Sequence, residues 1–126
     1  MNREEFEKLV FDTYDIKADY PFDEDFETGV FRHPSSQKWF ALAMKIHKDK
    51  IGLFGDEVID AVNLKCAPEV IDSLAGIETG IFRAYHMNKI HWLTIALNMC
   101  DNDTISWLLD ISYDLTKPKS KKIKGH

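Results

Sequence analysis

The chain has 126 residues, of which 44% are hydrophobic and 12% aromatic, and this is enough apolar material for one domain with a buried core. The formal net charge is −5, with −7 on residues 1–27, −3 on residues 28–116 and +5 on residues 117–126. An acidic body argues against strong binding to duplex DNA, because phosphate neutralisation by cations supplies most of that affinity. The sequence also lacks a long apolar run and a leader-like start, so it predicts no membrane span and no secretory signal.

The cysteines restrict the class of protein further. Cys66 and Cys100 are far apart and show no CxxC spacing, which excludes a disulfide framework and a structural zinc site. We therefore expect reduced thiols, a cytoplasmic location, no cofactor and no metal.

The first half of the chain predicts one helix and three strands. Asn2 and Glu5 have the spacing of a capping box, and apolar residues recur at helical intervals behind them. Pro21 lies beyond the end of this helix. The predicted helix covers residues 3–16, and the predicted strands cover residues 28–33, 38–47 and 57–65.

The second half begins with a helix that Pro68 opens and Gly76 ends, over residues 69–75. Two strands are predicted at residues 81–86 and 90–97, joined by a tight turn at 87–89. A last helix begins at the capping residues 101–103 and runs to Leu115.

This order of elements, α-β(3)-α-β(2)-α, predicts an α+β fold. We expect a two-layer sandwich in which an antiparallel five-stranded sheet carries the helices on one face. The predicted domain is single and covers residues 1–117, and residues 118–126 form a basic tail that we expect to be disordered.

Five short motifs in this order resemble the MmcQ/YjbR-like family of small bacterial proteins. They extend over nearly the whole chain, and the third and fourth are the most specific. The motifs are Tyr20 to Phe22 (YPF), Lys38 to Leu42 (KWFAL), Asn63 to Glu69 (NLKCAPE), Ala84 to Trp92 (AYHMNKIHW) and Leu108 to Leu115 (LLDISYDL).

The resemblance implies a secretion-chaperone-like or frataxin-like two-layer fold. It also implies DNA binding, which the family owes to a proposed double-wing likeness. We therefore expect a small binding module, with weak, salt-dependent binding to DNA and no enzymatic chemistry.

The candidate ligand-binding residues lie in the third and fourth motifs and the strand between them. Cations there could contact phosphates, and aromatic rings could stack on the bases of a single strand. The two histidines flank the predicted turn and could face each other across it, but a pair is too few for catalytic zinc. The candidates are Lys65, Arg83, Tyr85, His86, Lys89, His91 and Trp92.

Two other functions stay open. A protein-interaction adaptor, expected to be a monomer on its own, would use a sheet face or a groove near Trp92. An enzyme would use Cys66 as its nucleophile, because a thiol before a helix start and beside Lys65 could have a lowered pKa. The alternative role for Cys66 is that of a small buried hydrophobic residue.

Overall fold

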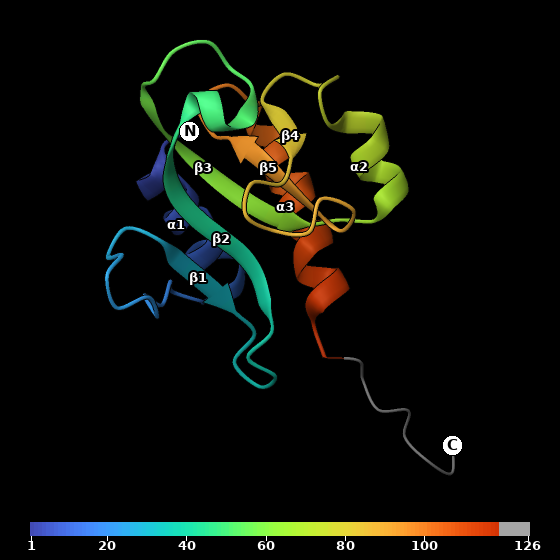
Figure 1. The fold of residues 1–126 in the computed structure, drawn as a ribbon. Coiled ribbons are helices and arrows are strands. Elements are labelled where there is room, and N and C mark those ends of the chain that lie inside the picture. Colours follow the sequence, from blue (N-terminus) through green and yellow to red (C-terminus); the bar gives the residue numbers. More distant parts are fainter. Residues whose placement is uncertain (119–126) are drawn as a thin grey trace.

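The computed structural model describes residues 1–118, which form three helices, one 3-10 turn and one five-stranded sheet (Figure 1). The element bounds, in chain order, are α1 (Arg3–Tyr14), β1 (Gly29–Arg32), β2 (Trp39–His47), η1 (Lys48–Ile51), β3 (Val58–Lys65), α2 (Pro68–Leu74), β4 (Ile81–Arg83), β5 (Trp92–Ala96) and α3 (Asn102–Thr116). The predicted basic tail lies, apart from Pro118, outside the described residues.

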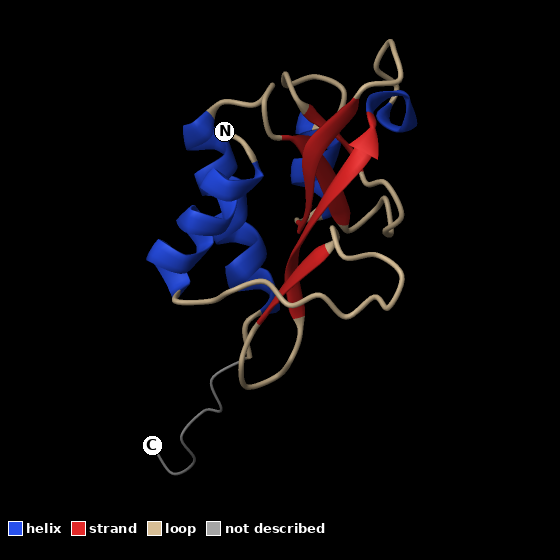
Figure 2. Cartoon of the chain, turned by 90° about the vertical axis from the view of Figure 1, so that its left-hand side faces the viewer, coloured by secondary structure: helices blue, strands red, loops and turns tan. Residues whose placement is uncertain are grey.

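The sheet has the order β1-β2-β3-β5-β4, and every pair of neighbouring strands is antiparallel. Figure 2 shows the two longer helices, α1 and α3, on one side of this sheet. The expected α+β architecture, with an antiparallel five-stranded sheet under its helices, is therefore confirmed.

Local sequence accounts for where the helices begin. The Asn2 side chain accepts the Glu5 backbone N–H, and the Glu5 carboxylate accepts the Asn2 N–H, so the capping box is complete. Asp101 caps α3 through the Thr104 N–H, and Pro68 occupies the first turn of α2.

The main core lies between the sheet and the helices. Residues of alternate parity on the central strands face the helices, as antiparallel pairing requires. Its fully buried members include Phe6, Phe31, Phe40, Leu64, Ile71, Leu93, Ile95, Ile105, Leu108 and Leu109.

A bulge in β2 decides where the aromatic residues of the second motif point. Phe31 pairs with Ala41, but the next β1 residue, Arg32, pairs with Trp39, so Phe40 has no partner on β1. Phe40 consequently enters the main core, while Trp39 packs on the opposite face of the sheet.

That opposite face, called here the open face, faces the viewer in Figure 1 and is covered by loops and η1 in place of long helices. It holds a second, smaller cluster of buried residues. The cluster consists of Val30, Leu42, Met44, Ile46 and Ala61, with Trp39, Ile51, Ile59, Tyr85 and Met87 packed against it.

The structure corrects the prediction for the last two strands. β4 ends at Arg83 and β5 begins at Trp92, so residues 84–91 form a longer loop where a tight turn was expected. His86 adopts a positive φ of 63°, and the Asn88 side chain accepts the N–H groups of Ile90 and His91. These local bonds draw the backbone out of the strand ladder.

No helix within residues 1–118 is long and apolar enough to cross a membrane.

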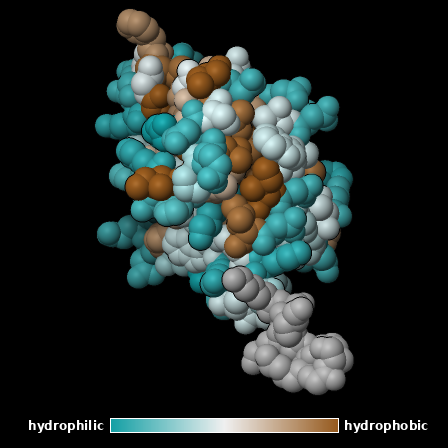
Figure 3. Space-filling view, turned by 90° about the vertical axis from the view of Figure 1, so that its right-hand side faces the viewer, coloured by the Kyte–Doolittle hydropathy of each residue, from teal (hydrophilic) through white to brown (hydrophobic). Residues whose placement is uncertain are grey.

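Figure 3 shows the side of the molecule on which α2 lies. Hydrophobic side chains there form a narrow band bordered by polar ones.

Candidate functional site

The third and fourth motifs meet in space at the paired strands β3 and β5. Lys65 lies opposite Trp92 in the ladder, and the Cys66 N–H donates to the His91 carbonyl at 2.9 Å. The sheet thus brings together two segments that lie well apart in the chain.

A buried polar network fixes the fourth motif to the open face. The Asn63 side-chain amide donates to the Tyr85 carbonyl at 2.8 Å, and the Tyr85 N–H donates to the Thr94 hydroxyl at 2.9 Å. The Thr94 hydroxyl in turn donates to the Asn63 side-chain oxygen. Asn63 and Thr94 are fully buried, and this network satisfies their polar atoms.

The loop 84–91 is closed by one of its own cations. The Lys89 ammonium donates to the Ala84 carbonyl at 2.7 Å, which leaves two of its N–H donors for other partners. The rings of Tyr85 and His86 lie 3.9 Å apart between centroids. The loop is therefore held from within as well as by Asn63.

Beside this loop lies a surface cavity of about 340 Å³, called here the basic cavity. Its polar side chains are Lys50, Arg83, Tyr85 and Lys89, and none of the described residues that line it is acidic. The remaining lining residues are Ile51, Ala75, Gly76, Phe82 and Ala84.

The three cations of the basic cavity differ in how they are held. One Arg83 guanidinium nitrogen lies 3.0 Å from the Asp72 carboxylate of α2, and the guanidinium keeps further N–H donors. Lys89 is held by Ala84, whereas the exposed Lys50 forms no ion pair with the described residues. Lys50 is thus the cation most available to an added anion.

The basic cavity includes three of the predicted site residues, Arg83, Tyr85 and Lys89, but not the others. Lys65 and Trp92 are half-buried neighbours on β3 and β5. His86 lines a different groove, described below, and His91 is exposed.

The structure adds two residues to the candidate site. Lys50 comes from η1 and was not among the predicted site residues. Phe82 was not predicted, because a strand residue gives no sequence signal that separates an outward ring from a core ring.

The thiol of Cys66 is buried, and burial raises its pKa above the ordinary value, with the nearby Glu69 carboxylate adding to the rise. A backbone hydrogen bond involving Ala67 acts in the opposite direction but does not reverse the shift. The direction is thus opposite to the helix-terminus effect that an activated nucleophile needs. Within residues 1–118, no cluster of three side chains could hold a metal ion.

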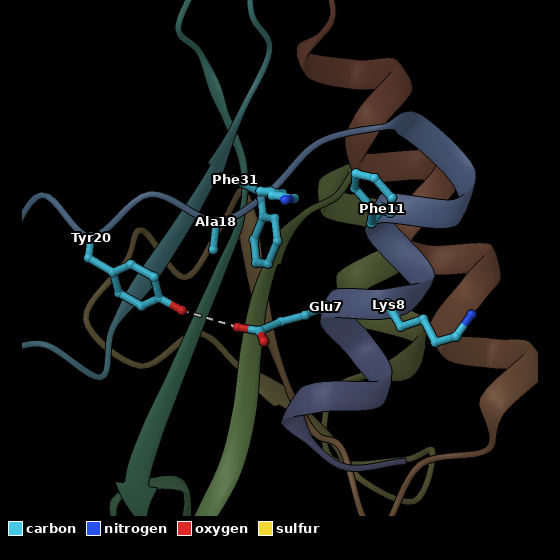
Figure 4. A pocket seen from close by; sticks show the side chains of 7 residues that line it. Glu7, Lys8, Phe11, Ala18, Tyr20 and Phe31 are labelled. Atoms are coloured by element: carbon cyan, nitrogen blue, oxygen red, sulfur yellow. Dashed lines mark hydrogen bonds between the residues drawn. The ribbon is translucent and has the colours of Figure 1, made fainter.

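A second cavity, of about 370 Å³, lies between α1 and the segment that follows it (Figure 4). The Tyr20 hydroxyl points across this cavity to the Glu7 carboxylate and donates to it at 3.2 Å. Glu7 also pairs with Arg3. The hydrogen bond between Tyr20 and Glu7 gives the YPF motif a structural role in joining this segment to α1.

Comparison with known proteins places these features in a wider group. Residues 11–115 match the model of a family described as YjbR. The chain is 39% identical over 118 residues to the uncharacterized protein YyaQ of Bacillus subtilis (strain 168), covering 93% of this chain and 99% of that protein.

Solved structures are similar too. A crystal structure of a Pseudomonas syringae protein is 42% identical, with a TM-score of 0.89, and the match covers 93% of this chain and all of that one. A solution NMR structure from the same organism has a TM-score of 0.87 at 39% identity, covering 98% and 99% of the two chains. A Deinococcus radiodurans protein, at 24% identity over 90% of this chain and 77% of that one, shares the fold with a TM-score of 0.64.

Proposed function

Because the chain belongs to the YjbR family and carries the basic cavity, we propose that it is a small, non-catalytic binding protein that holds phosphates of single-stranded DNA there. The observation that carries this proposal is the lining of the cavity, where the described residues supply three cationic side chains and no acidic one, and only Arg83 pairs with a nearby carboxylate, that of Asp72. Phosphate binding needs such a local excess of positive charge.

The rings beside the cations support a single strand over a duplex. Phe82 and Tyr85 both line the cavity, and an aromatic ring next to a cation can stack on an unpaired base. Lys65 and Trp92, which lie opposite each other on β3 and β5, extend the proposed contact along the sheet. The acidic residues 1–27 keep the expected affinity low, and the contacts between cations and phosphates make it salt-dependent.

We further propose that the protein acts in the cytoplasm as a monomer. Its two cysteines are buried and free, as is usual in a reducing compartment.

The test is fluorescence anisotropy of a labelled single-stranded oligonucleotide, titrated with the protein between about 50 mM and 200 mM salt. Lys50→Glu is the informative variant, because Lys50 lines the cavity. Lys50 forms no ion pair with the described residues, so the substitution should leave the fold unchanged. We expect it to abolish most of the binding and to lower the salt slope by about one.

Lys38→Glu is the matched control, since Lys38 is also exposed and lies outside the cavity, and the substitution changes the net charge by the same amount. An equal loss of binding in both variants would show a non-specific charge effect. No binding by the unchanged protein at the lowest salt would refute the proposal outright.

A further inference from the structure

We propose that a second surface, on the open face, binds a basic and apolar segment of a partner protein. The surface is a groove of about 470 Å³, called here the apolar groove. Its apolar and aromatic lining consists of Phe22, Trp39, Leu42, Met44, His86 and Met87. This proposal does not depend on DNA binding at the basic cavity.

The floor of the apolar groove is the outward row of β2. Leu42 and Met44 lie two residues apart, so both point to the open face. Met87 of the loop 84–91 forms one wall, and its thioether, like that of Met44, can adapt to partners of different shape. A second hollow adjoins the groove and shares Asp25, Thr28, Met44 and His86 with it. Its far side carries Lys45 and Lys50 and leads toward the basic cavity, so the acidic border lies only on the side of residues 19–27.

The other wall is the acidic segment, residues 19–27, and its attachments show that the groove is preformed. Its start pairs with β1 through backbone bonds between Asp19 and Val30 and through an ion pair of Asp19 with Arg32 at 2.8 Å. Its middle packs Phe22 edge-on against Trp39, with ring centroids 6.1 Å apart. Its end is held by Arg3, which donates to the Glu27 carbonyl.

Between these attachments the acidic segment presents charge and apolar surface together. Asp23, Glu24 and Glu27 are exposed and pair with no described cation, and Phe26 is 81% exposed. Phe26 follows Asp25, which lines the groove, so this exposed ring can extend the apolar surface of the groove. The unpaired carboxylates around it specify that the partner is positively charged.

The charge also decides against the other occupants of this groove. A nucleic acid or an anionic lipid surface would meet Asp23 and Glu24 with like charge. A second copy of the chain, joined by a two-fold axis, would bring two such acidic borders into one interface. In a protein segment with alternating lysine and leucine side chains, the leucines can pack in the groove and the lysines can pair with the carboxylates on its border.

The test uses the full chain and a fluorescent peptide of alternating Lys and Leu, followed by anisotropy. Asp23→Lys combined with Glu24→Lys should weaken binding by about tenfold or more, and Phe26→Ser should weaken it as well. Glu4→Lys combined with Glu78→Lys is the charge-matched control, and Phe54→Ser is the control for an exposed ring; both should bind as the unchanged protein does.

Each other outcome overturns the proposal in a different way. Equal binding of an alternating Glu and Leu peptide would remove the charge argument. A dimer in sedimentation experiments that Phe26→Ser disperses would make a second copy the occupant. A gain of about tenfold in peptide affinity when the lysines of residues 119–126 are replaced by serine would make the chain's own C-terminal segment the occupant.

Discussion

The side chain of Asn63 has the largest structural consequence of any single polar residue in the third motif. It is fully buried beneath the open face and joins β3 to both β5 and the loop 84–91. The co-occurrence of the third and fourth motifs therefore has a physical reason, since the amide in one holds the backbone of the other.

Replacing Asn63 tests this directly. Asn63→Ala leaves the Tyr85 carbonyl and the Thr94 hydroxyl without their partner, so we expect a loss of about 2–3 kcal/mol in the free energy of unfolding. Urea denaturation measures it. Asn98→Ala, at an exposed position, should stay within about 0.5 kcal/mol of the unchanged protein, and similar losses in both variants would argue against the network.

Cys66 gives a second prediction at the scale of one residue. Since burial raises the pKa of its thiol, little thiolate forms at neutral pH, and the native protein should react slowly with a disulfide reagent. In a Cys100→Ser background at pH 7.5, we expect the native reaction to be at least about tenfold slower than in urea. Fast reaction of the native thiol would instead restore the enzyme hypothesis.

Among the elements, the helices and the first three strands follow closely from the sequence. Asn2, Pro68 and Asp101 signal helix starts through capping chemistry that acts locally, so no tertiary information is needed. The loop 84–91 was harder to predict, because its course depends on the distant side chain of Asn63 as well as on its own local hydrogen bonds.

The candidate site was predictable only in part. Arg83, Tyr85 and Lys89 lie close together in the chain, so their gathering at one cavity follows from local sequence. Lys50 reaches the same cavity from η1 through the antiparallel pairing of the sheet. Long-range pairing of this kind leaves no signal in the spacing of residues.

The turn between α2 and β4 gives a prediction at the scale of elements. Gly80 has a φ of 84°, and an added Cβ would lie 2.8 Å from the Cys100 backbone nitrogen. Gly52 has the same φ but open space around it. We therefore expect Gly52→Ala to cost about 1 kcal/mol and Gly80→Ala about 2–3 kcal/mol, because only the latter adds a clash to the backbone strain.

Thermal or urea unfolding of the two variants makes this comparison. The matched φ cancels the backbone contribution, so the difference reports the packing of the turn against the start of α3. If the two variants lose the same free energy of unfolding, the turn at Gly80 can shift away from Cys100 without a further loss of stability.

At the scale of the whole molecule, His33 joins the β1–β2 connection to the end of α3. Its imidazole Nε2 lies 2.8 Å from the Thr116 hydroxyl at the end of α3, and its ring packs on Phe40 and Tyr113. This contact ties the β1–β2 connection to the last helix.

The contact predicts a pH dependence of stability. Burial lowers the pKa of His33 below its ordinary value of 6.5; a backbone hydrogen bond involving Tyr113 opposes this shift, and the charges of Lys117 and Lys38 add to it. The unfolded chain therefore takes up a proton before the folded one, and stability contributed by neutral His33 is complete above pH 6.5 and falls as the pH drops through the folded pKa.

Urea midpoints measured from pH 7.5 down to pH 5 should decline, and His33→Gln should flatten the decline whatever its effect at pH 7.5. If the urea midpoints of the unchanged protein and of His33→Gln decline in parallel between pH 7.5 and pH 5, His33 is not the source of that decline.

Asp60 and Asp25 act at lower pH. Their folded pKa values are also lowered, so the stability they contribute is present above their ordinary value of 3.8 and is lost as the pH falls below it.

The bulge at Phe40 has a consequence for spectroscopy. By turning Trp39 onto the open face, it places an indole between the Phe22 ring and the Arg32 guanidinium, 5.9 Å from the indole ring. Emission from this indole should shift when its surroundings lose water, whereas Trp107 on α3 stays at its own distant, exposed position. Trp92 and Trp107 emit in Trp39→Phe as well, so the difference between the spectra of the two proteins isolates an intrinsic optical probe of the open face without an added dye.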